Sequence, residues 1–100
     1  MEYRSEFTGS PVVVVNEGVL TFDDHERFRE LVGILADQAP GPVVFDLSGL
    51  TMIDSAGIGM LIMANDRIVK RGGGLRLRGV SGQVAKVVEL SRIEQLIPIG

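Results

Sequence analysis

Residues 43–60 read VVFDLSGLTMIDSAGIGM, and this stretch predicts a strand, a loop and the start of a helix. Residues 43–47 are apolar except for Asp46 and include two β-branched side chains, which is typical of a buried strand. Residues 48–51 are predicted as a loop, and residues 52–55 lead into a helix that begins at Ser55. Sites in open α/β sheets collect in loops beyond the carboxyl ends of strands, so we expect the functional site here.

The sequence before this stretch predicts two strands and one helix. Residues 2–8 fit a modest edge strand, and residues 12–15 form a valine run typical of a buried strand. Residues 16–18 are predicted as a turn, after which the strand pairing resumes. A helix then begins with Asp23 or Asp24 as its N-cap, because a short acidic side chain can accept from exposed backbone N–H groups. Its inward side chains are Phe28, Leu31, Val32 and Leu35, and the sequence APGP at residues 39–42 ends it.

The sequence after this stretch predicts two further helices and two further strands. The helix that starts at Ser55 ends at the glycines of residues 72–74, and its predicted inward face is Ile58, Leu61, Ile62, Asn65, Ile68 and Val69. Residues 75–78 alternate as in a strand with one solvated face. Ser81 caps the last helix, whose predicted inward side chains are Val84, Val87, Val88 and Leu90. Residues 96–99 fit either a last short strand or an extended tail.

The predicted order of elements is β-β-α-β-α-β-α-β, with helices between strands. Such an order favours right-handed crossovers and a mostly parallel sheet. We therefore expect an α/β fold in which helices pack on a sheet of four to five strands. A chain of 100 residues is long enough for one domain, which we assign to residues 1–100.

Composition and charge exclude several classes of function. The chain has no cysteine and one histidine, His25, so we expect no disulfide, no metal centre and no cofactor. Residues 1–66 carry 11 acidic and 3 basic side chains, which argues against nucleic-acid binding. Residues 67–100 carry 7 basic and 2 acidic side chains, and this part of the chain could attract an acidic partner. No signal peptide or membrane-length apolar run occurs, so a cytoplasmic protein without membrane insertion is expected.

Ser55 and the glycines after it allow two interpretations each. Ser55 is either a helix cap or a phosphorylation site, since a phosphate at a helix N-terminus finds free N–H donors and a favourable dipole. Gly57 and Gly59 each lower the stability of a helix by roughly 1 kcal/mol relative to alanine, so the presence of each glycine needs an explanation. That explanation is either tight packing of the helix on the sheet or close approach of a partner protein.

The sequence IDSAGIG at residues 53–59 resembles the signature of STAS domains, the family of anti-sigma factor antagonists. The resemblance extends over residues 2–99, because the valine-rich strand, the strand at 43–47, the glycine turn at 72–74 and the last helix follow in family order. It implies a single STAS-type domain. Family members usually carry a further C-terminal helix, which is not predicted before Gly100.

The resemblance also implies a regulatory cycle in which this domain is the substrate and not the enzyme. The unphosphorylated domain would bind an anti-sigma factor that is also a serine-protein kinase, and phosphorylation of Ser55 would release it. A phosphoserine phosphatase would reverse the step. The residues implied in partner binding are Asp23, Asp24, Asp54, Ser55, Ala56, Gly57, Ile58 and Gly59.

Two other functions stay open on the sequence. The domain could be a STAS subunit that is not switched, held in a scaffold or in a lipid-transport complex, with Ser55 only a cap. It could also be a small hydrolase or a nucleotide-binding protein. The enzyme hypothesis is the weaker one, because the sequence shows no nucleophile and base in a catalytic arrangement and we assign no catalytic residue.

Overall fold

The computed structural model describes residues 2–6, 12–38 and 42–99, which form five strands, three α-helices and two 3-10 helices. The strands are β1 (Glu2–Glu6), β2 (Val12–Leu20), β3 (Pro42–Asp46), β4 (Leu50–Ile53) and β5 (Gly74–Arg78). The α-helices are α1 (His25–Gln38), α2 (Ser55–Lys70) and α3 (Gly82–Ser91). Two short 3-10 helices, η1 (Phe22–Asp24) and η2 (Ile93–Gln95), complete the described elements.

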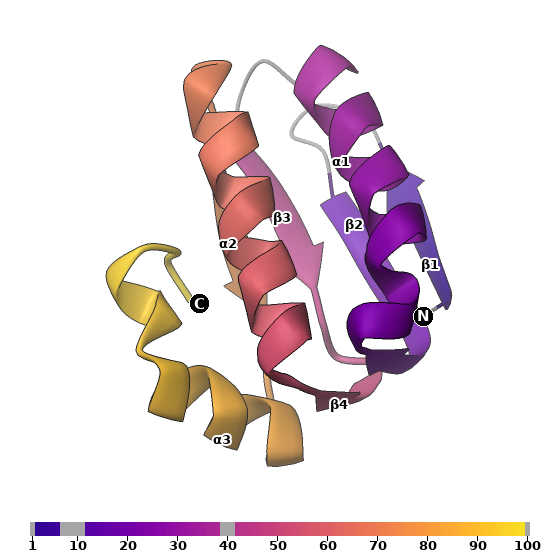
Figure 1. Cartoon of the computed structure of the whole chain (residues 1–100), viewed down its shortest axis with the longest axis vertical. Coiled ribbons are helices and arrows are strands. Elements are labelled where there is room, and N and C mark those ends of the chain that lie inside the picture. Colours follow the sequence, from indigo (N-terminus) through magenta and orange to yellow (C-terminus); the bar gives the residue numbers. More distant parts are fainter. Residues whose placement is uncertain (1, 7–11, 39–41, 100) are drawn as a thin grey trace.

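The five strands form one mixed sheet with the order β1-β2-β3-β5. β1 is antiparallel to β2, whereas β2 and β3, and β3 and β5, are parallel. β4 lies parallel to the last part of β2, where Ile53 is opposite Leu20. Figure 1 shows α1 and α2 side by side over one face of the sheet, with α3 below them next to β4. The predicted α/β fold with a mostly parallel sheet is therefore confirmed.

Two connections predicted in the first half of the chain are wrong. Residues 16–18 are not a turn, because β2 continues through them and Gly18 absorbs an irregularity with a positive φ of 105°. Residues 48–51 are not all loop, since β4 begins at Leu50. The Leu50 N–H donates to the Leu47 carbonyl at 2.9 Å, so a tight turn redirects the chain and leaves enough residues to pair with β2.

Residues 96–99, predicted as either a short strand or an extended tail, do not form a regular strand. The segment contributes one parallel bridge between Ile99 and Leu77, and the Leu77 N–H donates to the Pro98 carbonyl at 2.9 Å. Proline has no N–H to continue a ladder, which limits the pairing to this point. Residues 7 and 8 of the predicted first strand, and residues 39–41 of the predicted helix end, lie outside the described residues.

The hydrophobic core lies between the sheet and its helices. The predicted inward side chains of α1 are all buried, and Phe28 meets Phe45 of β3 edge to face at 5.8 Å between ring centroids. In α2 and α3, the buried side chains include Ile58, Leu61, Ile68, Val84 and Val88, as predicted. The sequence also places Ile62, Val69 and Leu90 inward, which is wrong, because each helix packs along one stripe and these three side chains are exposed.

Asp46 anchors the turn between β3 and β4. Its carboxylate accepts hydrogen bonds from the Ser48 backbone N–H and from the Arg78 Nε, both at 3.0 Å. The Ser48 hydrogen bonds, followed by the Arg78 guanidinium, hold the pKa of the Asp46 carboxyl below its usual value. Because the folded pKa is lower than the unfolded one, ionised Asp46 stabilises the fold above the unfolded pKa.

We expect the stability that Asp46 contributes to disappear in acid. It is fully present above the unfolded pKa of about 3.9 and is lost as the pH falls through the lower folded value. The free energy of unfolding, measured by urea denaturation from neutral pH downward, should therefore decline less steeply below about pH 4 in Asp46→Asn than in the wild type. Parallel declines in the two proteins would contradict this role.

Candidate functional site

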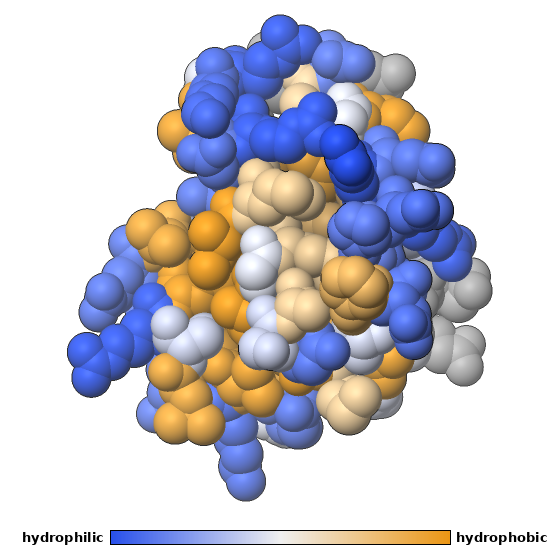
Figure 2. Space-filling view, viewed as in Figure 1, coloured by the Kyte–Doolittle hydropathy of each residue, from blue (hydrophilic) through white to orange (hydrophobic). Residues whose placement is uncertain are grey.

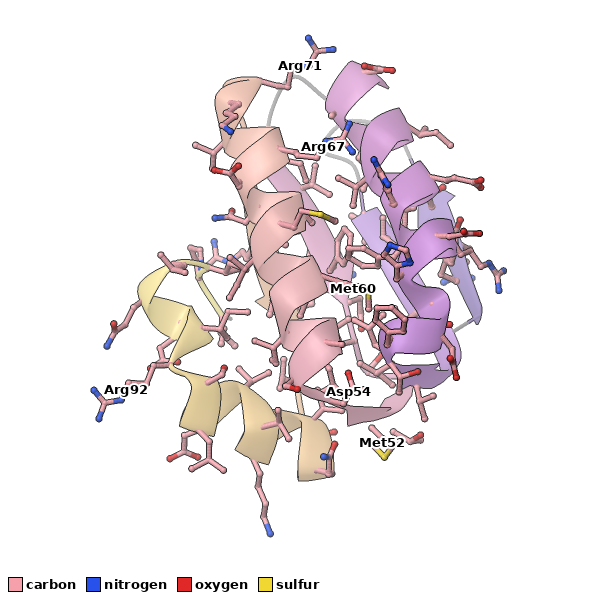
Figure 3. The ribbon with its side chains drawn as sticks, in the orientation of Figure 1. Met52, Asp54, Met60, Arg67, Arg71 and Arg92 are labelled. Carbon is pink, nitrogen blue, oxygen red and sulfur yellow. The ribbon has the colours of Figure 1, made fainter. Side chains whose placement is uncertain are left out.

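The motif stretch lies where β4 ends and α2 begins. Because β2 and β4 are parallel, their carboxyl ends meet at one edge of the sheet, and η1 follows β2 at the same edge. The Asp54 N–H donates to the Leu20 carbonyl at 3.3 Å, which joins the two strand ends directly. In Figure 3, Asp54 lies at the lower end of α2, with Met52 of β4 beyond it. The structure therefore places the motif at the predicted edge.

Asp54, and not Ser55, caps helix α2. Its backbone is extended (φ −107°, ψ −178°) and its Oδ1 accepts from the Gly57 N–H at 2.7 Å. The Asp54 carbonyl accepts from the Ile58 N–H at 3.0 Å, which starts the helical hydrogen bonds. The interpretation of Ser55 as the cap is therefore wrong. The reason is that Asp54 occupies the N-cap position and its side chain takes the donor that a serine cap would satisfy.

Ser55 is the first residue of α2 and its side chain is exposed. Within the described ranges, its hydroxyl forms no hydrogen bond with any residue. The first N–H groups of a helix have no intrahelical acceptor and favour an anion, whereas the Asp54 carboxylate beside Ser55 opposes one. Ser55 is therefore an accessible hydroxyl that the fold does not use.

The two glycines after Ser55 differ in their surroundings. A Cβ on Gly57 would lie 2.5 Å from the Leu20 carbonyl oxygen and 2.6 Å from the Ile53 Cγ1. A Cβ on Gly59 would meet no atom within 4 Å, and Gly59 is exposed. Tight packing on the sheet therefore explains Gly57. It does not explain Gly59, because no close contact within the described fold requires a glycine at this position of the helix.

The acidic residues before α1 do not cap it as the sequence predicts. The 3-10 helix η1 begins at Phe22, two or three residues earlier than an N-cap at Asp23 or Asp24 predicts. It follows Thr21, whose N–H donates to the Asp24 Oδ2 at 3.0 Å. Partial burial acts to raise the pKa of the Asp24 carboxyl, but this hydrogen bond and nearby positive charges, Arg27 included, lower it on balance. The Asp23 side chain is exposed at the same edge as Asp54.

Two apolar side chains near the motif are exposed, and the sequence did not single out the first of them, Phe22. Phe22, which is two residues after Leu20, is 67% exposed and stacks on the His25 ring at 5.3 Å between centroids. Met52 is 43% exposed on β4. Figure 2 shows apolar surface extending over the α2 region, between polar surfaces on either side. Contiguous apolar surface that polar residues surround is typical of a protein-binding surface.

The described residues offer little for metal chemistry or for crossing a membrane. No group of three or more His, Cys, Asp or Glu side chains among them could hold a metal ion. None of the described helices is long and apolar enough to cross a membrane.

Comparisons with known proteins bear on the family and the fold. A sequence model of the family described as "Mlab, STAS domain" matches residues 3–98. A STAS-domain containing protein of Pseudomonas aeruginosa is 30% identical over 91 residues, which are 91% of this chain and 89% of that protein.

Two solved structures share the fold. An anti-sigma factor antagonist from Mycobacterium paratuberculosis has a TM-score of 0.83 at 21% identity, covering 98% of this chain and 83% of that one. The Bacillus cell fate determinant SpoIIAA in its phosphorylated form has a TM-score of 0.72 at 16% identity, covering 99% and 91%.

Proposed function

Because the chain belongs to the STAS domain family, we propose that it is an anti-sigma factor antagonist whose partner binding is switched by phosphorylation of Ser55. In this proposal the unphosphorylated domain binds an anti-sigma factor that is also a serine-protein kinase. The kinase transfers the γ-phosphoryl group of ATP to the Ser55 hydroxyl, and the hydroxyl proton leaves to a base of the kinase. A phosphoserine phosphatase restores the hydroxyl by hydrolysis. Since the cycle uses ATP, we place it in the cytoplasm.

The observation that carries this proposal is the division of roles between Asp54 and Ser55. Asp54 caps α2 through Gly57, so the helix start does not depend on Ser55. Ser55 is exposed and is not used by the described fold. A residue that the fold does not need can be modified without unfolding the domain, which is what a reversible switch requires.

Charge supplies the physical mechanism of release. A phosphoserine adds about −1.5 to −2 charges at neutral pH. It would stand beside the Asp54 carboxylate and at the same edge as the exposed Asp23. The negative charge of this edge would increase. A partner that fits the unphosphorylated edge would then face a charge that its own surface does not match, or it would lose a close contact.

The partner surface that we propose surrounds Ser55. Asp23, rather than Asp24, supplies the acidic contact before α1, because the Asp24 carboxylate already accepts from Thr21. Gly59 lets a partner backbone approach α2, since nothing within the described fold occupies the space above it. Ala56 and Ile58 complete the motif stretch, and Gly57 serves it indirectly by seating α2 on the sheet.

The test is a phosphorylation assay with the wild type and Ser55→Ala. The kinase is sought among neighbouring genes as a histidine-kinase-like ATPase. With ATP, we expect one phosphate on the wild type, located at Ser55 by mass spectrometry, and none on Ser55→Ala. Because Asp54 is the cap, Ser55→Ala should unfold at the wild-type urea concentration, which shows that the loss is chemical and not structural. A phosphate on another residue, with Ser55 unmodified, would contradict the proposal.

A second candidate function is a STAS subunit that is not switched, within a scaffold or a lipid-transport complex. Exposed apolar side chains remote from Ser55 favour it, since Val69 near the end of α2 and Leu96 after η2 line one groove with Val44. Phosphorylation of Ser55 would leave that groove unchanged. Stable co-purification with assembly subunits that is insensitive to Ser55→Ala and Ser55→Glu would support this candidate over the first.

A further inference from the structure

Gln83, in the first turn of α3, forms two hydrogen bonds with the backbone of one residue of β4. Its Oε1 accepts from the Ile53 N–H at 3.1 Å, and its Nε2 donates to the Ile53 carbonyl at 3.3 Å. β4 pairs with β2 along its other edge. The Gln83 amide therefore occupies the position that the peptide group of a further strand would take, with one donor and one acceptor.

These two hydrogen bonds act at the junction that presents Ser55. Ile53 directly precedes the cap Asp54, and its side chain is buried. On the β2 side, the Leu20 carbonyl accepts from the Asp54 N–H. On the other side, only the Gln83 amide bonds the Ile53 backbone among the described residues. The end of β4 is thus held from both sides immediately before the phosphorylation site that we propose.

We propose that Gln83 is a positioning residue for Ser55, which fixes the β4–α2 junction in the geometry that a kinase and a binding partner recognise. The inference rests on the proposed function and adds α3 to the elements that control it. Gln83 itself touches neither Ser55 nor a phosphate, and it acts through Ile53 and Asp54. A loose junction would let the start of α2 fray, so that the Ser55 hydroxyl would reach the reactive geometry in fewer encounters.

The position of Gln83 makes the idea testable without unfolding the chain. Gln83 is an exposed residue and its two hydrogen bonds are only partly buried, so water can replace them in part and we expect their loss to cost little of the total stability. Gln83→Ala keeps a good helix former in α3 and removes both bonds. Gln95→Ala is the matched control, because Gln95 is an exposed glutamine whose side chain bonds no residue within the described ranges.

Two measurements on these variants separate positioning from general stability. By NMR hydrogen exchange, we expect the Ile53 amide to exchange about fivefold faster in Gln83→Ala, the change that losing roughly one hydrogen bond produces. Amides of the core strand β3 should keep their wild-type exchange rates. In the kinase assay, kcat/KM for Ser55 should fall about fivefold in Gln83→Ala, while Gln95→Ala should match the wild type.

A pH signature distinguishes the amide geometry from mere helix packing. In Gln83→Glu, the new carboxylate at neutral pH can accept from Ile53 but cannot donate to its carbonyl. Near pH 4 the protonated carboxyl regains a donor, so protection of the junction amides, corrected for intrinsic exchange, should recover toward the wild type. A variant in which protection does not recover in acid would count against the paired geometry.

The outcomes separate this inference from the proposed function. Phosphorylation of Ser55 at equal rates in the wild type and Gln83→Ala would overturn the positioning role and leave the switch intact. A fivefold loss confined to Gln83 variants, with unchanged unfolding midpoints, would support both. No phosphate on wild-type Ser55 would overturn the switch itself, and the positioning role with it.

Discussion

Gly57→Ala is expected to destabilise the domain by about 2–3 kcal/mol, near the upper range for inserting one methyl group into a packed interior. The added Cβ would lie 2.5 Å from the Leu20 carbonyl oxygen, a backbone atom in the sheet that cannot rotate away. Its other neighbour, Ile53, is buried and has little room to move. The gain in helix propensity of about 1 kcal/mol is too small to offset this clash. In a domain of this size, the melting temperature should fall by roughly 10–20 °C.

Gly59→Ala is the matched control, two residues further along the same helix. Its Cβ would meet no atom within 4 Å, so only the propensity term remains and the domain should become more stable by up to about 1 kcal/mol. Urea denaturation of both variants measures the expected loss of stability in Gly57→Ala and the expected gain in Gly59→Ala. If Gly57→Ala were as stable as Gly59→Ala, the close packing of α2 on β2 and β4 would be wrong.

The same pair of variants also separates packing from partner binding. Gly57 serves the fold, whereas Gly59 has no partner atom in the described structure. If the open space above Gly59 admits a partner backbone, Gly59→Ala should bind that partner more weakly although it is the more stable protein. A loss of binding together with a gain in stability has no explanation in the fold alone.

The periodic parts of the fold were predictable from sequence, because local patterns determine them. The valine run of β2, the apolar spacing of Phe28, Leu31 and Leu35, and the helix start at Ser55 all depend on residues near one another. The connections that were predicted wrongly depend on pairing with residues that are distant in the sequence. Residues 50–53 become a strand only because the end of β2 supplies a partner, and four residues carry too little pattern to reveal it.

The candidate site shows the same division. The motif stretch itself was located correctly, but neighbouring residues of suitable type could exchange roles without changing the local pattern. Asp54 and Ser55 are both good caps, and only the backbone conformation and the hydrogen bond to Gly57 assign the role to Asp54. Gln83 lies 30 residues from Ile53 along the chain, and no local signal connects them.

Phosphorylation of Ser55 is expected to weaken binding of the anti-sigma factor by about a hundredfold or more, because a charged group that loses its hydration at an interface without a matching charge costs several kcal/mol. The domain should stay folded, with an unchanged unfolding midpoint, since Ser55 does not cap α2. Isothermal titration calorimetry with the unmodified and the phosphorylated protein measures the difference. Gln95→Glu adds one negative charge on the exposed surface of η2 and should bind as the wild type does.

Charge and size can be separated at Ser55 itself. Ser55→Glu and Ser55→Gln introduce side chains of nearly equal volume, but only the first is charged. If repulsion releases the partner, Ser55→Glu should bind distinctly more weakly than Ser55→Gln, and added salt should narrow the gap, because the Debye length shrinks from about 10 Å at 0.1 M to about 3 Å at 1 M. Equal losses in both variants would instead show that the partner packs against α2 too closely to admit a larger side chain.

One alternative route remains, in which the phosphate repels the Asp54 carboxylate and loosens the cap instead of acting on the partner. Asp54→Asn tests it, because asparagine caps a helix about as well as aspartate but carries no charge. If the phosphate acts within the domain, phosphorylation of the Asp54→Asn protein should no longer release the partner. If it acts on the partner, the hundredfold loss should persist. The hydrogen bond of 2.7 Å from the Gly57 N–H to the Asp54 Oδ1 is compatible with either route. The comparison therefore decides whether the phosphate charge acts on the Asp54 cap or on the partner.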